Sequence, residues 1–174
     1  MLLLLSCTIF LSPSFFIQKA HGGGKKNDER SLMQFYDQIK DADIKLANLQ
    51  AAVQQSGTGD KGFEGQGFLS VTYPSVLIRE RFGVIMDTLK SYGKIHNNTE
   101  KQECKKTLLR YLNNTVAETD IYLDQNIESS QGLLQHEELK NSLPYVKRFV
   151  TILKSFQPIL GDFILEGYAI EKGI

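Results

Sequence analysis

The apolar residues of this chain recur at alternating intervals of three and four residues in four separate segments, and this spacing decides the fold class. A period near 3.5 residues keeps one side of a helix apolar along its whole length. The first segment covers about residues 28–55, with its apolar positions at Leu32, Phe35, Ile39, Ala42, Leu46, Leu49 and Val53. It predicts a long amphipathic helix.

Two further segments carry the same period. The second covers about residues 74–93 and is expected to begin near Pro74, because proline fits the first turn of a helix. The third covers about residues 99–130 and has a broad apolar face with Leu109, Leu112 and Val116. Each segment predicts one more long helix.

The fourth segment, about residues 141–172, keeps the spacing on both sides of Pro158. An interior proline usually kinks or ends a helix at a cost of about 3 kcal/mol. If the helix ended at Pro158, a new helix would have no reason to resume the apolar positions in phase. We therefore expect one long helix, kinked at Pro158.

Helices that share this period pack at about 20° to one another, which predicts an all-α four-helix bundle over residues 28–172. The connections suggest its topology. Residues 56–73 form a long, Gly-rich connection that could cross the whole bundle, residues 94–98 are short, and residues 130–141 are long again. Long, short and long connections predict an up-up-down-down bundle. Leucines in the last connection indicate a short helix there.

The first residues are unlike the rest of the chain. Residues 2–17 contain no charge and are followed by the small residues Ala20 and Gly22. This apolar run is too short to span a membrane as a typical helix, and Pro13 interrupts it. It predicts a signal peptide over residues 1–22, a flexible N-terminus over residues 23–27, and a secreted, extracellular mature chain without membrane insertion. A signal anchor is the competing interpretation, since no basic residue precedes the run.

Two N-x-Thr triplets agree with export. They begin at Asn97 and Asn113, and both are predicted to carry N-glycans. Cys7 lies in the predicted signal peptide, so Cys104 is alone in the mature chain. It is either a buried free thiol, which we favour, or one half of an intermolecular disulfide in a homodimer.

The residues show no recognisable catalytic or metal-binding pattern. Zinc motifs, di-iron motifs and Cys-x-x-Cys pairs are absent from the sequence. His136 with its acidic neighbours is better explained as a solvated turn than as a metal site, and residues 57–62 lack the spacing of a phosphate loop. Lys+Arg and Asp+Glu both count 20, which gives no reason to expect nucleic acid. We therefore expect a protein that is not an enzyme and has no cofactor.

Four residues are candidates for contact with a partner protein. Phe63 and Phe68 lie in the predicted long connection, where they could either tuck over the bundle, which we favour, or anchor a partner. Arg79 and Arg81 lie beside the apolar positions of the second helix and should face solvent. Exposed faces of this kind are where a binding bundle would make its contacts.

The predicted signal peptide, N-glycan sites, four long helices and order of connections together resemble a helical cytokine. This resemblance implies a signalling ligand that binds a cell-surface receptor. The lack of an intrachain disulfide is similar to the interferon-gamma group, which implies a homodimer. Two other functions stay open: a secreted effector or inhibitor of a host or target protein, and a carrier of small apolar ligands. Leu, Ile and Phe at the packing positions favour a solid core over a carrier cavity.

Overall fold

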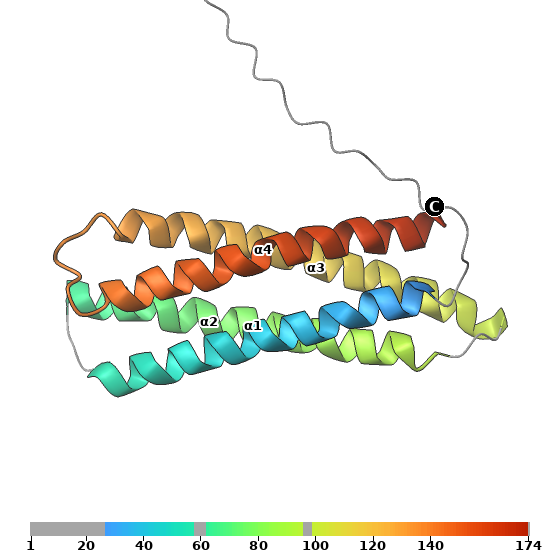
Figure 1. The fold of residues 1–174 in the computed structure, drawn as a ribbon, viewed down its shortest axis with the longest axis horizontal. Helices are drawn as coiled ribbons and strands as arrows, with labels where there is room; N and C mark the ends of the chain where they lie inside the picture. Colours follow the sequence, from blue (N-terminus) through green and yellow to red (C-terminus); the bar gives the residue numbers. More distant parts are fainter. Residues whose placement is uncertain (1–26, 58–61, 96–98, 174) are drawn as a thin grey trace, which may run out of the picture.

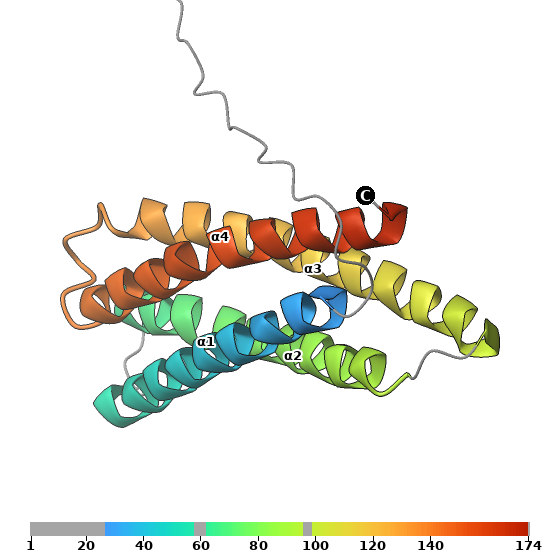
Figure 2. The same ribbon diagram turned by 45° about the vertical axis from the view of Figure 1, so that its right-hand side comes forward.

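The computed structural model describes residues 27–57, 62–95 and 99–173, which form four helices. They are α1 (Asn27–Gly57), α2 (Phe63–Gly93), α3 (Thr99–Leu133) and α4 (Leu143–Lys172). No strand occurs in the described ranges. The helices lie side by side in both views (Figures 1 and 2). The predicted all-α four-helix bundle is confirmed.

Consecutive helices of the bundle run in opposite directions (Figures 1 and 2). Only residues 58–62 lie between α1 and α2, and they can span roughly 20 Å at full extension. The 31 residues of α1 are about 46 Å long, so this connection cannot return the chain to the other end. The prediction of a long Gly-rich crossover and an up-up-down-down topology is therefore wrong.

The error lies in where α2 begins. The helix starts at Phe63 and continues through Pro74, which stands in its interior. Phe68 and Val71 are 2% and 0% exposed, and burying each such side chain contributes about 1.5–3 kcal/mol. Together these burials offset the roughly 3 kcal/mol cost of an interior proline. Pro74 therefore does not mark the helix start, although proline often does.

The helix α4 crosses Pro158 without a break, as the continuous apolar spacing predicts. Phe156 and Leu160 are buried on either side of the proline, at 2% and 0% exposure. Ser155 donates its hydroxyl proton to the carbonyl oxygen of Ile152 at 2.8 Å. The prediction of one long helix is confirmed.

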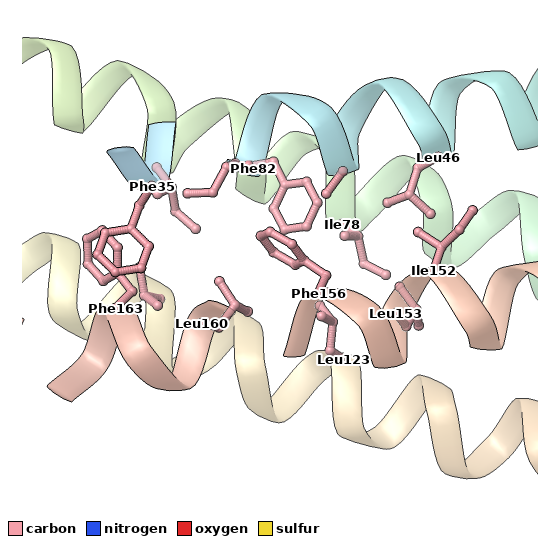
Figure 3. Close-up of a cluster of buried hydrophobic side chains, with 14 of the residues drawn as sticks. Phe35, Leu46, Ile78, Phe82, Leu123, Ile152, Leu153, Phe156, Leu160 and Phe163 are labelled. Carbon is pink, nitrogen blue, oxygen red and sulfur yellow. The ribbon is translucent and has the colours of Figure 1, made fainter. Parts of the chain in front are cut away.

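The predicted apolar positions of the four helices meet in one core (Figure 3). Two pairs of aromatic rings pack edge to face within it. The Phe35 and Phe163 ring centroids are 4.9 Å apart, and those of Phe82 and Phe156 are 4.7 Å apart. The helices α2 and α4 also approach each other across the bundle, which places Phe82 against Phe156 near its centre.

The connection between α3 and α4 forms turns and not the short helix that its leucines suggested. Leu139 is fully buried, and its carbonyl oxygen accepts a hydrogen bond of 2.8 Å from the Leu143 N–H. Burial of this one leucine holds the connection against the bundle. Here the apolar residues act through packing and without a regular helix.

Candidate protein-interaction face

The predicted contact residues Phe63 and Phe68 lie on α2 and not in a loop. Phe68 is 2% exposed and packs near Tyr145, with ring centroids 5.8 Å apart, so it packs against the bundle as the favoured alternative predicts, and a partner contact at Phe68 is wrong. Phe63 is 41% exposed, with its ring 5.2 Å from that of His136. Only Phe63 of this pair is open to a partner.

The two predicted arginines face different neighbouring helices. Arg79 donates to Asp43 at 2.8 Å and to Gln50 at 3.1 Å, and both acceptors lie on α1. Arg81 lies over the Tyr122 ring on α3, with its guanidinium carbon 5.1 Å from the centroid. Both side chains keep about a third of their surface exposed. They hold α2 to its neighbours, and Arg79 also borders the surface described next.

One end of the α1–α2 pair has an outer surface without charge. Residues 46–57 of α1 and residues 65–78 of α2 contain no Lys, Arg, Asp or Glu. Because α1 ends where α2 begins, these two stretches lie at the same end of the bundle (Figure 1). Their outward side chains define the neutral face, which includes Ala51, Gln54, Leu69, Tyr73 and Val76.

The neutral face exposes two large apolar side chains, one turn apart. Leu69 is 63% exposed and Tyr73 is 66% exposed. Residues four apart on a helix lie on the same side, so their side chains form one ridge. An apolar ridge bordered by polar residues is typical of an interaction surface. The Arg79–Asp43 ion pair closes the face toward the middle of the bundle.

At the other border, Glu64 joins the start of α2 to the start of α4. Its Oε1 accepts a hydrogen bond from the Asn141 N–H at 2.9 Å. Its Oε2 accepts from the Ser142 N–H at 3.1 Å and from the Ser142 hydroxyl at 2.9 Å. The Asn141 N–H is the main reason why the pKa of Glu64 lies below its ordinary value of 4.5. The carboxylate thus caps the start of α4 and ties it to the start of α2.

Replacing Glu64 with glutamine is expected to lower the thermal midpoint by a few degrees at neutral pH, because α4 loses a charged cap. A lowered pKa means that this stabilisation is complete above about pH 4.5 and is lost as the pH falls through the folded-state pKa. The difference in midpoint between the two proteins should therefore shrink in acid. Thermal unfolding followed by circular dichroism across this pH range measures it, with Glu80→Gln on the same helix as control. A difference that stays constant with pH would contradict the cap.

The predicted modification sites have different surroundings. Asn113 is 1% exposed, and its Nδ2 donates to Glu171 at 3.2 Å. A glycan on this nitrogen would have to separate α3 from α4, so the predicted N-glycan at Asn113 is incompatible with the folded bundle. Asn97 lies outside the described residues. Cys104 is exposed and free, which contradicts the favoured buried thiol. An intermolecular disulfide through it stays a prediction.

Ionisable groups in the described residues do not gather into a metal site of three or more His, Cys, Asp or Glu side chains. Asp120 has a raised pKa because of burial and, second, because of the nearby Asp124 carboxylate. An open depression of about 350 Å³ lies between α1 and α4, and its lining residues include Asp37, Asp41 and Phe156. Neither feature provides a nucleophile, a base and a stabilising group together.

The neutral face was not found from the sequence because half of it was interpreted as a loop. The signal was present, since residues 46–59 and 65–78 are the two stretches that lack charge at the ends of the first two helices. No protein family, curated protein or solved structure matches this chain. Among the described residues, no helix is both long and apolar enough to cross a membrane.

Proposed function

We propose that this chain is a secreted helical bundle that binds a partner protein through the neutral face on α1 and α2. One observation supports the proposal most: Leu69 and Tyr73 expose about two thirds of their surface within a face that has no charge. Removing such side chains from water on binding would contribute favourably in proportion to the apolar area buried.

The composition of the face favours a protein partner over other ligands. The centres of protein interfaces are poor in charged residues and rich in tyrosine, and Tyr73 would be the aromatic anchor. Nucleic acids and anionic lipids require Lys or Arg for their phosphates, and residues 65–78 contain neither. A small-molecule ligand would need a deeper, more enclosed site than a single ridge.

The partner we propose is a cell-surface receptor, with the chain acting as a signalling ligand. An effector or inhibitor that binds a target protein would use the same contacts. The topology gives the resemblance to helical cytokines no support, because consecutive helices are antiparallel (Figure 1). The binding proposal rests on the neutral face and on the predicted signal peptide, and not on that resemblance.

The test is a binding screen of the purified chain against displayed cell-surface and secreted proteins. Each binder is measured again with the double variant Leu69→Ser/Tyr73→Ser. The expected loss is at least about thirtyfold in affinity, which is the size of a hot spot of about 2 kcal/mol. The matched control is Ile44→Ser, which removes an apolar side chain that is 48% exposed elsewhere on α1.

The proposal fails if the double variant binds every recovered partner as tightly as the unchanged chain. It also fails if the control weakens binding as much as the double variant does. Circular dichroism of each variant is the control that checks whether the bundle is intact. If receptor-bearing cells respond to the chain, it acts as a ligand; if it only blocks another ligand, it acts as an inhibitor.

A further inference from the structure

The charges of this chain balance overall but are unevenly placed along it. Residues 139–161 cover the end of the α3–α4 connection and the larger part of α4, and they contain four basic residues and no Asp or Glu. The basic residues are Lys140, Lys147, Arg148 and Lys154, and all four are exposed. We name these four residues the basic face.

The basic residues of α4 lie on one side of the helix. Lys147 and Lys154 are seven residues apart, which places them two turns apart on the same side, and Arg148 adjoins Lys147. Thr151 is exposed between them and donates its hydroxyl proton to the Lys147 carbonyl oxygen at 2.9 Å. The outer side of α4 is therefore a polar, cationic strip over these turns.

The four cations of the basic face are free within the part of the chain that the structure describes. None of their side chains forms an ion pair or a hydrogen bond with another described residue. Other lysines of the chain differ in this respect, since Lys45 lies 2.6 Å from Asp41 and Lys106 lies 3.0 Å from Glu103. An unpaired cation keeps its interactions available to an anionic ligand.

Acidic residues lie beside the basic face, in the adjoining chain or on neighbouring helices, but not within it. They are Glu64, Asp124, Glu128, Glu137, Glu138 and Asp162. Glu64 caps the start of α4, and Asp124 accepts a hydrogen bond from Gln157. In the described ranges none of the six is paired with a cation of the basic face. The positive charges of the face are therefore not neutralised by direct contacts.

The basic face begins at a polar depression between the end of α1 and the start of α4. The depression has a volume of about 540 Å³, which lies in the size range of small-ligand sites. Lys140 lines it together with Ser56, Asn141 and Tyr145. Their ammonium, hydroxyl and amide groups can donate hydrogen bonds to the oxygens of a sugar or a sulfate.

We propose that the basic face binds a sulfated polysaccharide. Its sulfates lie against Lys147, Arg148 and Lys154, and one sugar unit occupies the depression beside Lys140. Clusters of Lys and Arg are the usual binding surface for such polyanions. Binding is favoured because counterions of the polyanion are released when the cations neutralise its charges.

The polar character of the basic face favours a polysaccharide over other polyanions. Single-stranded nucleic acids stack their bases on exposed aromatic rings, and helices that lie in a lipid surface insert apolar side chains. None of the large apolar side chains that the described residues expose lies in residues 139–161. The predicted signal peptide would also bring the chain outside the cell, where sulfated polysaccharides occur.

The test is a titration of a fluorescent heparin oligosaccharide with the purified chain at several salt concentrations. The double variant Lys147→Gln/Arg148→Gln is expected to bind at least about tenfold more weakly at low salt. The slope of log affinity against log salt should also fall by about one for each cation removed. Circular dichroism checks that each variant keeps the bundle.

The matched control is Lys90→Gln/Lys106→Gln, which removes the same number of charges from α2 and α3. Each of these lysines lies beside an acid of its own helix, at 3.5 Å and 3.0 Å. The control should change heparin affinity less than about threefold, because these cations are already paired. An equal loss in both variants overturns the proposal, since net charge alone would then explain binding.

Other ligands and the absence of binding give the remaining outcomes. A chain that does not bind heparin even at low salt overturns the proposal. Single-stranded DNA and phosphatidylserine vesicles are titrated in parallel, and tighter binding to either one overturns the choice of a sulfated polysaccharide. The neutral face is tested with a protein partner and separate variants, so either proposal can fail without the other.

Discussion

Replacing Gly67 with leucine is expected to destabilise the bundle by about 3 kcal/mol, at the upper end for an overpacked site. A Cβ at Gly67 would lie 2.1 Å from Ser142 Oγ, 2.8 Å from Ser142 Cβ and 3.0 Å from Leu139 Cδ2. These distances are far below van der Waals contact, so the start of α2 would have to move away from the α3–α4 connection. The hydrogen bonds from Ser142 to Glu64 would break with it. Urea unfolding followed by circular dichroism measures the loss.

The matched control for this variant is Gly83→Leu on the same helix. A Cβ at Gly83 would meet nothing within 4 Å, so only the backbone effect remains. Replacing this glycine in the helix interior is expected to raise the free energy of unfolding by about 0.5–1 kcal/mol. Opposite signs for the two variants are therefore expected. Equal losses would show that the close approach at Gly67 does not limit stability.

The sequence predicted the helices well where burial and periodicity agree. The seven predicted apolar positions of α1, from Leu32 to Val53, are all buried, because one apolar residue every three or four keeps a single face against the core. The same rule correctly predicts that α4 continues through Pro158. Local spacing is sufficient for these features because each depends on only one helix.

The topology could not be predicted from the same rule, because it depends on where α2 begins. Proline fits the first turn of a helix, so the sequence predicts that α2 begins at Pro74 and that the residues before it form a long connection. In the structure Phe68 and Val71 belong to the core, and their burial decides the boundary. That burial comes from contacts with other helices, which a single segment does not reveal.

The candidate site was missed for the same reason, and one predicted site was misplaced. Leu69 and Tyr73 can be recognised as exposed neighbours on one helix only when α2 is known to begin at Phe63. Asn113 follows the buried residue Leu112 on α3. The N-x-Thr triplet of Asn113 does not by itself indicate that α4 covers this side chain. Chemical motifs identify residue types, whereas exposure depends on which helix lies opposite.

The largest effect in the core is expected at the centre of the bundle, where Phe156 meets Phe82. Replacing Phe156 with alanine should cost about 3–5 kcal/mol, since a 2% exposed aromatic side chain is lost and a cavity remains. Chemical denaturation gives the free energy of unfolding directly. Leu165→Ala is the matched control on the same helix and should change it little, because that side chain is 72% exposed.

The ring contact itself can be separated from the loss of volume. The Phe82 and Phe156 rings pack edge to face at 64° between planes, a geometry worth about 0.5–1.5 kcal/mol beyond simple burial. A double-mutant cycle of Phe82→Leu and Phe156→Leu should therefore give a coupling of that size. If the free-energy changes of the two substitutions are additive, the rings contribute only by occupying volume and not through a specific ring contact. Because Phe82 lies on α2 and Phe156 on α4, a measurable coupling would also confirm that these two helices meet across the bundle, which antiparallel neighbours alone do not require.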